Sequence, residues 1–135
     1  MGSIERAQRE ADKCSLVCAN CHRIRHAQAK TKSGHPVVRY RQNIKVRAVL
    51  AAGGVCLGCG LSGPVDALEF HHLDAREKEF GISVDGVARS WARVQAELAK
   101  CVLACANCHR EAHAGLRHFG PSLSEAAGPN RVHAA

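Results

Sequence analysis

Four cysteines stand at spacings that suit a metal ion. They form two Cys-x-x-Cys pairs, Cys56 with Cys59 and Cys105 with Cys108. Each pair places two thiolates within reach of one ion, and two pairs complete a tetrahedral shell of four sulfurs with no open position. The spacing therefore predicts a structural zinc ion held by these cysteines, with buried free thiols or disulfides as the alternative.

Four histidines predict a second ion of a different kind. His109 and His113 are four residues apart, so on a helix they project from one face and can bind the same ion. The pair needs a third ligand, which His71-His72 can supply from the end of a strand expected over residues 67–73. A site of three imidazoles keeps an open coordination position for water or a phosphate oxygen, unlike the closed cysteine shell.

The stretches CLGCG, LEFHHLD and KCVLACANCHREAH together resemble an HNH endonuclease of the zinc-knuckle type common in bacteria and their phages, over about residues 40–118. The resemblance implies an α+β chain with a ββα-metal fold, in which two strands and the helix with His109 and His113 pack around one divalent ion. It implies a metal-dependent DNA endonuclease that hydrolyses phosphodiester bonds. In that scheme His72 is the general base that activates water. The ion, which stabilises the scissile phosphate and the leaving 3′ oxygen, is held by His71, His109 and His113.

The chemistry of imidazole agrees with these roles. A neutral imidazole titrates near neutral pH and can take a proton from water, while a cation offsets charge that grows on a phosphate. Three imidazoles suit Mn²⁺, Ni²⁺, Co²⁺ or Zn²⁺ better than Mg²⁺ by ligand softness, although phosphate and water ligands also make Mg²⁺ usable. Neighbouring residues of a regular strand face opposite ways. His71 and His72 therefore serve one site only if the strand ends or bulges there, and their roles can be reversed.

The chain departs from the HNH pattern at one position. The middle Asn of the family name usually stands about five residues before the second cysteine pair, where this chain has Lys100. Asn107 lies inside the knuckle, which is a different position. In the family this Asn holds a loop in place. In this chain the backbone carbonyls near Lys100, or another side chain, are expected to hold that loop.

A second copy of the helix motif lies near the N-terminus. KCSLVCANCHRIRH, residues 13–26, matches KCVLACANCHREAH, residues 100–113, at ten of fourteen positions, but no Cys-x-x-Cys or His-His pair precedes it. Three interpretations stay open: a vestige held by packing, exchange with residues 100–113 for the upstream cysteines, or a second zinc. That zinc would lie within the copy, or would be shared with a matching pair from a second subunit in a homodimer. Its candidate ligands are Cys14, Cys18, Cys21, His22 and His26.

The counterpart of Cys14 in the other copy is Cys101, which we expect to be buried as a small apolar residue. This expectation weakens a zinc site that includes Cys14. A count of zinc ions per chain separates a vestige from a second site.

Two other functions remain as alternatives. A zinc-dependent nucleic-acid-binding module without catalysis also combines zinc knuckles with basic runs, but it has no need for four histidines around an open site. CANCH is also the CxxCH string that attaches c-type haem. Against haem stand the upstream Cys56/Cys59 pair, the absence of an export signal from the first residues and the lack of any methionine except Met1.

Positive charge gathers in the N-terminal part of the chain. Residues 1–50 carry 11 Lys and Arg against 3 Asp and Glu, whereas residues 51–135 carry 8 against 9. Such a run predicts a surface that grips DNA phosphates in a salt-sensitive way, largely blind to sequence, although a solvated basic face has the same composition. The expected DNA-binding residues are Arg23, Arg25, Lys30, Lys32, Arg39, Arg41, Lys45, Arg47 and Arg110.

The composition describes a small chain with a thin core. Only five of its 135 residues are Phe, Trp or Tyr, so a structural metal or disulfides are expected to offset chain entropy. The first 14 residues lack the apolar region of a signal peptide, and no run approaches ~18 apolar residues. The expected location is therefore the cytoplasm, with reduced thiols and no membrane segment.

Periodicity and turn residues place the elements that position these groups. Residues 75–89 are expected to form a connecting loop with short extended pieces, and a second strand is expected near residues 102–104. Helices are expected over residues 4–13, 19–30, 40–52, 91–100 and 106–114. The predicted domains are an N-terminal half-repeat over 1–35, the nuclease domain over 36–118 and a disordered tail over 119–135.

Overall fold

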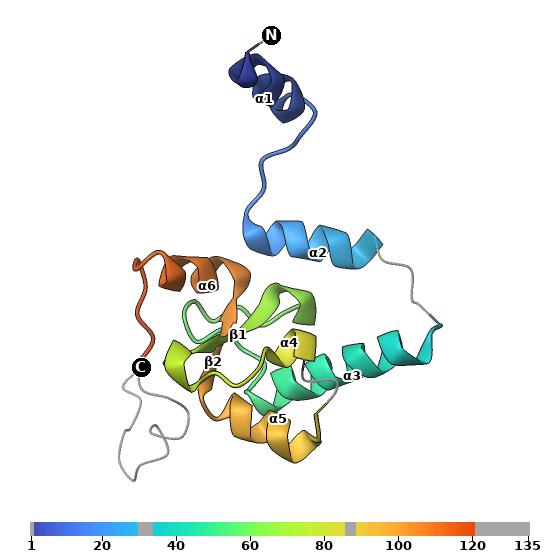
Figure 1. Cartoon of the computed structure of the whole chain (residues 1–135), viewed down its shortest axis with the longest axis vertical. Helices are drawn as coiled ribbons and strands as arrows, with labels where there is room; N and C mark the ends of the chain where they lie inside the picture. The colour runs from blue at the N-terminus through green and yellow to red at the C-terminus, as the bar shows by residue number, and fades with distance from the viewer. Residues whose placement is uncertain (1, 30–33, 86–88, 121–135) are drawn as a thin grey trace.

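A two-stranded antiparallel sheet lies inside the fold, and helices surround it (Figure 1). β1 (Leu68–His72) pairs with β2 (Cys101–Cys105) in an unbroken register, with Leu68 opposite Cys105 and His72 opposite Cys101. This mixture of helices and one small sheet confirms the α+β class.

The computed structural model describes residues 2–29, 34–85 and 89–120. The predicted disordered tail therefore lies outside the described residues from position 121 onward. Among the helices of the described ranges, none combines the length and apolar character needed to cross a membrane.

Five helices fall where the sequence predicts them, within a few residues at each end. Their bounds are α1 Ser3–Ala11, α2 Ala19–Ala29, α3 Pro36–Ala51, α5 Trp91–Leu98 and α6 Ala106–His113. The N-terminus of α3 lies earlier than expected, because Pro36 suits a first helical turn and the His35 ring accepts a hydrogen bond from Val37 N at 3.3 Å.

The segment between the strands contains short helical turns that the sequence did not predict, and Lys78 between them has the extended backbone expected of the loop. The turns are η2 (Ala75–Glu77) and α4 (Ile82–Asp85). Asp74 starts η2 because its side chain accepts a hydrogen bond from Arg76 N at 2.9 Å. A third short turn, η1 (Val65–Ala67), leads into β1.

The core consists of two apolar clusters that share α3. One cluster contains Val49 and the other Ala48, so consecutive residues of α3 hold the two together. All five residues of β2 are buried, and the prediction that Cys101 is buried is confirmed by its 1% exposure. Three of the four predicted zinc ligands are core residues, namely Cys56, Cys105 and Cys108.

The internal repeat is longer than the motif that first shows it. Residues 3–26 match residues 90–113 at 14 of 24 positions, and α1 and α2 correspond to α5 and α6. The copies differ in the segment between their helices. Leu103 in β2 is 2% exposed, whereas the equivalent Leu16 is fully exposed, and residues 14–18 form no strand in the described part of the chain.

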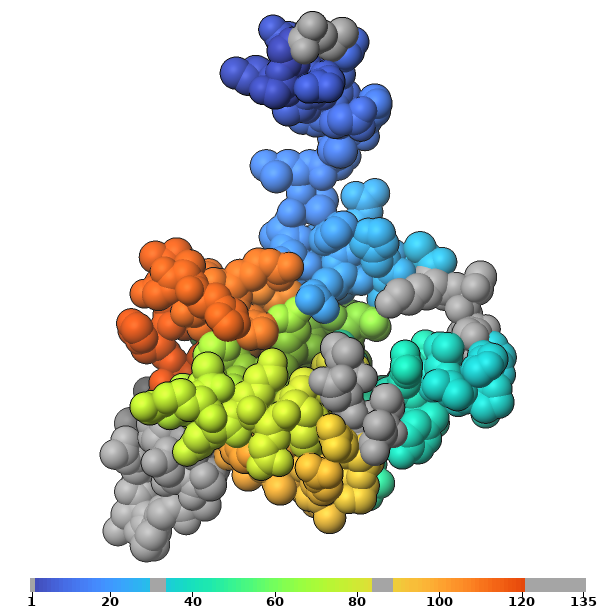
Figure 2. All heavy atoms as spheres, in the orientation of Figure 1, coloured from blue at the N-terminus to red at the C-terminus, as the bar shows by residue number. Residues whose placement is uncertain are grey.

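The two copies contact each other through equivalent asparagines. Asn20 N donates to Asn107 Oδ1 at 3.3 Å, and Asn107 N donates to Asn20 Oδ1 at 3.1 Å. The reciprocal pair joins α2 to α6, and both helices lie on the same side of the sheet in Figure 1. α1 contains no buried residue, and Figure 2 shows it standing away from the rest of the molecule.

Candidate metal centres

The four cysteines of the two Cys-x-x-Cys pairs converge. The sulfurs of Cys56, Cys59, Cys105 and Cys108 all lie within 4.8 Å of one another. Cys59 Sγ and Cys105 Sγ are 3.7 Å apart, close to the ~3.8 Å edge of a tetrahedron with sulfurs ~2.3 Å from its centre. The donor set and its spacing therefore fit a metal ion such as zinc, and we call these four residues the cysteine cage.

Local structure brings the two cysteine turns together. Cys105 ends β2 and caps α6, because its Sγ accepts a hydrogen bond from Cys108 N at 3.5 Å. Gly58 permits the first turn to approach the second, since a Cβ at this position would lie 2.9 Å from Cys108 Sγ. Arg117 donates to Gly58 O at 2.9 Å and holds the turn from outside.

The thiols of the cage differ in how readily they ionise. Burial raises the pKa of Cys108, and the neighbouring thiols raise it further. Burial also opposes ionisation of Cys105, but hydrogen bonds from Cys108 N and the Asn20 side chain lower the pKa of Cys105 to about 7. Since zinc replaces thiol protons, a lowered pKa favours zinc binding at Cys105.

Three of the four predicted histidines also converge. One ring nitrogen from each of His71, His109 and His113 lies within 4.8 Å of the other two. The Nε2 atoms of His109 and His113 are 3.0 Å apart, which suits two ligands ~2.1 Å from one ion at an angle of ~90°. Three imidazoles are a donor set that fits a divalent transition metal. We call these residues the histidine triad.

Glu69 orients one ring of the triad. Its Oε2 accepts a hydrogen bond from His109 Nδ1, which leaves the lone pair of His109 Nε2 facing His113. This hydrogen bond lowers the pKa of Glu69, against the opposing effect of burial. Arg23 of α2 forms an ion pair with the other oxygen, so the first copy of the motif supports the centre built by the second.

Burial lowers the pKa of His71, and the charges of the neighbouring imidazoles add to the effect. A lowered pKa favours the neutral ring that metal binding requires. The Phe119 ring lies 5.3 Å from the His71 ring, whereas His113 is exposed. The triad is therefore covered on one side and open to solvent on the other.

His72 does not join the triad. The β1–β2 ladder continues through His72 without a bulge, so its side chain lies on the face of β1 opposite to that of His71. His72 Nε2 is 2.6 Å from Glu97 Oε1, and the two side chains are 8% and 1% exposed. No bulge lies between the two histidines, but His72 is the last residue of β1, so their side chains leave opposite faces at the point where the strand ends.

Glu97 and Lys100 hold the segment between the strands. Glu97 Oε1 accepts from Glu79 N at 2.9 Å and Phe80 N at 3.5 Å, and Lys100 Nζ donates to Glu77 O at 3.0 Å and Glu97 Oε2 at 2.7 Å. Burial opposes ionisation of Glu97, but its donors, led by Lys100 and Glu79 N, lower its pKa to about 2. Lys100 thus holds a loop carbonyl from the position where the HNH resemblance expects an Asn.

The first copy of the motif reproduces half of each centre. His22 Nε2 and His26 Nε2 are 2.9 Å apart, and Cys21 N donates to Cys18 Sγ at 3.5 Å. The Cys14 thiol instead donates to the carbonyl oxygen of Glu10 at 3.2 Å. Within the described ranges, no group of three or more ligand atoms includes any of these side chains. One chain therefore does not assemble the predicted four-ligand zinc site of the first copy.

The described DNA-binding candidates differ in their surroundings. Arg25 lies exposed on α2, and Arg39 and Arg41 lie exposed on α3. Arg23 is paired with Glu69, and the Arg47 guanidinium lies 3.9 Å from the centre of the Trp91 ring. The others are Arg110, which donates to the Ala106 carbonyl, half-buried Lys45, and Lys30 and Lys32, which lie outside the described residues.

The sequence did not predict three residues that contact the centres or His72. Glu69 stands two positions before His71, so strand alternation places both on one face and is a signal for it. Asn20 repeats Asn107 in the first copy, and nothing in the spacing indicates their contact. Glu97 lies on the helix before β2, with no local sign of its link to His72.

The two centres differ in donors and in exposure. The cysteine cage is a closed set of four sulfurs, and the histidine triad is an open set of three nitrogens with a carboxylate behind it. No protein-family model, curated protein or solved structure matches the chain. The two centres are therefore the features that bear on its function.

Proposed function

We propose that the chain is a metal-dependent DNA endonuclease of the HNH type, with zinc in the cysteine cage and the histidine triad as its catalytic metal centre. The observation that carries the proposal is the convergence of His71, His109 and His113, oriented by Glu69, beside a separate cage of sulfurs. When bound at the triad, a divalent ion such as Mg²⁺, Mn²⁺, Ni²⁺ or Zn²⁺ supplies positive charge to the scissile phosphate and the leaving oxygen.

His72 is the proposed general base, a role that requires its ring to reach the attacking water from the opposite face at the end of β1. Glu97 accepts a hydrogen bond from His72 Nε2, so the lone pair of the neutral ring lies on Nδ1. The water oxygen bonds to phosphorus, its proton passes to His72 Nδ1, and the bond from phosphorus to the 3′ oxygen breaks. The Glu97 carboxylate stabilises the imidazolium that forms, as a carboxylate does behind other catalytic histidines. Solvent water then protonates the leaving oxygen.

The exposed arginines supply the proposed contacts to DNA. Arg25 on α2, with Arg39 and Arg41 on α3, can reach backbone phosphates without reading bases. Binding through such contacts weakens steeply with added salt. The proposal therefore includes salt-sensitive cleavage with little sequence preference.

A plasmid-nicking assay with Mg²⁺, Mn²⁺ and Ni²⁺ tests the proposal. His72→Ala is expected to lower the cleavage rate by ~10²–10⁴-fold, the usual contribution of a general base, and His109→Ala is expected to abolish cleavage. His118→Ala is the matched control, because His118 is exposed and belongs to neither centre. Zinc content and circular dichroism establish that each variant is folded. Equal cleavage by wild type and His72→Ala contradicts the assignment of the base.

A zinc-dependent nucleic-acid-binding module without catalysis is the second candidate. The 8% exposure of His72 favours it, because a ring held between the sheet and a buried carboxylate also suits a purely structural role. This candidate predicts that the wild type shifts DNA in a gel and cleaves none with any of the three ions. Cleavage that His109→Ala abolishes excludes it.

A further inference from the structure

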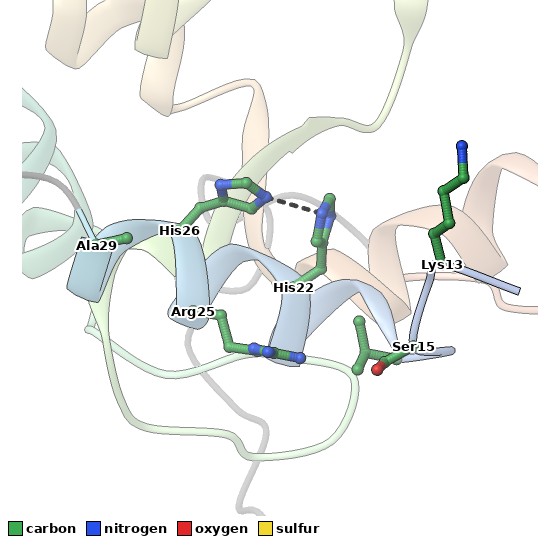
Figure 3. Close-up of a pocket in the computed structure, with 7 residues that line it drawn as sticks. Lys13, Ser15, His22, Arg25, His26 and Ala29 are labelled. Atoms are coloured by element: carbon green, nitrogen blue, oxygen red, sulfur yellow. Dashed lines mark hydrogen bonds between the residues drawn. The ribbon is translucent and has the colours of Figure 1, made fainter. Parts of the chain in front are cut away.

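A pocket outside both centres lies along α2. It has a volume of about 400 Å³, and seven residues line it: Lys13, Ser15, Val17, His22, Arg25, His26 and Ala29. Figure 3 shows the His22 and His26 rings next to each other on the helix, with Arg25 extending along it towards Ser15. None of these residues belongs to the cysteine cage or the histidine triad.

The imidazole pair in this pocket has the geometry of a metal-binding pair. His22 Nε2 and His26 Nε2 are 2.9 Å apart, compared with 3.0 Å between His109 and His113 in the triad. Both distances suit two ligands ~2.1 Å from one ion. The equal spacing follows from the repeat, since both pairs are separated by one helical turn.

The charge around this pair differs from that around the triad. Glu69 places a carboxylate behind His109, whereas none of the seven lining residues of the α2 pocket is acidic. Arg25 adds a positive charge to the lining, and Lys13 adds another that Glu10 partly offsets. An anion that binds together with the cation therefore stabilises a cation at the His22–His26 pair more than a cation at the triad.

We propose that His22 and His26 hold one divalent transition-metal ion, and that a phosphate oxygen completes its coordination. Two imidazoles leave at least two positions of a tetrahedral shell open. The Arg25 guanidinium suits a phosphate because its planar fork donates two parallel hydrogen bonds. The phosphate is inorganic or belongs to a nucleic acid, and the site does not depend on the proposed nuclease activity.

Calorimetric titration of the zinc-loaded full chain with Ni²⁺ tests the metal site. The wild type is expected to bind one Ni²⁺ at the triad and one at α2. The His22→Ala, His26→Ala double variant is expected to lose one ion, while His118→Ala keeps both. Cys18→Ser with Cys21→Ser is also expected to keep both. A stoichiometry that the histidine double variant leaves unchanged, or that only the cysteine double variant lowers, overturns the proposal.

Titrations in inorganic phosphate and in a DNA duplex of equal phosphate concentration test the second ligand. The Ni²⁺ ion at His22 and His26 is expected to bind at least about fivefold more tightly in one of these two solutions than without phosphate. Fivefold is the lower end of ordinary coupling between two sites. Tighter binding in phosphate identifies the free anion, and tighter binding in DNA alone identifies the nucleic-acid backbone. Arg25→Ala is expected to remove this gain and to keep the ion. Unchanged Ni²⁺ affinity in both solutions overturns the proposal.

Discussion

The two copies of the CANCH motif have the same local geometry in different surroundings. In each copy the backbone nitrogen of the second cysteine lies 3.5 Å from the sulfur of the first, and the paired histidine nitrogens lie 2.9 Å or 3.0 Å apart. The distal partners differ: the second copy joins its cysteines to the knuckle turn and its histidines to His71 of β1, whereas the first copy packs mainly on α6 and η1 and reaches β1 through the Arg23–Glu69 ion pair. Cys105 and Cys108 are therefore buried, whereas Cys18 and Cys21 are exposed.

This difference shows that the motif supplies only part of each set of ligands and that the fold supplies the rest. Spacing alone sets two sulfurs and two nitrogens at the start of a helix and along it, because the four residues lie within about two and a half helical turns. The remaining ligands come from Cys56, Cys59 and His71, which lie more than 30 positions earlier than α6 in the chain. The first copy retains a different use, since Arg23 and Asn20 contact the centres of the second copy.

The largest expected effect comes from removing the cage sulfurs. Cys105→Ser with Cys108→Ser is expected to lose zinc and to unfold, because structural zinc contributes ~10–16 kcal/mol in zinc-finger peptides, as much as the whole stability of a small domain. Cys18→Ser with Cys21→Ser is the matched variant in the first copy and is expected to keep both zinc and melting temperature. Zinc analysis and thermal denaturation followed by circular dichroism measure both. Equal loss from the two variants contradicts the difference between the copies.

The next effect compares equivalent glutamates. Glu97→Ala removes the carboxylate that accepts hydrogen bonds from His72, Lys100 and two backbone N–H groups. Because these buried donors lose their acceptor, the free energy of unfolding is expected to fall by ~3–5 kcal/mol. Glu10 also pairs with its lysine, Lys13, but both side chains are exposed. Glu10→Ala is therefore expected to leave the urea midpoint unchanged. A similar shift in both variants contradicts the role of Glu97.

A smaller effect is expected from acid. The pKa of Glu97 is lowered from 4.5 to about 2, so its contribution to stability is present above the ordinary value and is lost as the pH falls towards 2. The difference in stability between wild type and Glu97→Gln is expected to shrink over that interval. Urea denaturation at a series of pH values measures it, with Glu10→Gln as the control. A difference that stays constant from pH 5 to pH 2 contradicts the lowered pKa.

The smallest effect concerns Arg23, which ties the first copy to the triad. Arg23→Ala is expected to weaken Ni²⁺ binding at the triad by about three- to tenfold, below the ~10–100-fold typical of a group in direct contact with a ligand. Arg110 occupies the equivalent position in α6 and bonds to Ala106 O. The charge of Arg110 also acts on Glu69, but less strongly than that of Arg23, so Arg110→Ala is the control and is expected to lower the affinity less. A larger loss of Ni²⁺ affinity in Arg110→Ala than in Arg23→Ala contradicts the proposed role of Arg23 at the triad.

Much of the fold and of both centres could be predicted from the sequence. Periodicity placed five helices, and spacing identified the cysteines and histidines whose ligand atoms come together. The contacts of Glu97 could not be predicted from the sequence, because they depend on how the segment after β1 folds over α5. The contact between Asn20 and Asn107 could not be predicted either, since it joins residues 87 positions apart.

Anomalous diffraction from crystals grown with zinc and soaked in Ni²⁺ tests the central claim most directly. We expect a zinc peak inside the cysteine cage, ~2.3 Å from its sulfurs, and a nickel peak ~2.1 Å from the nitrogens of the histidine triad. A zinc peak at Cys18 and Cys21 with none in the cage, or no peak among His71, His109 and His113, contradicts the account.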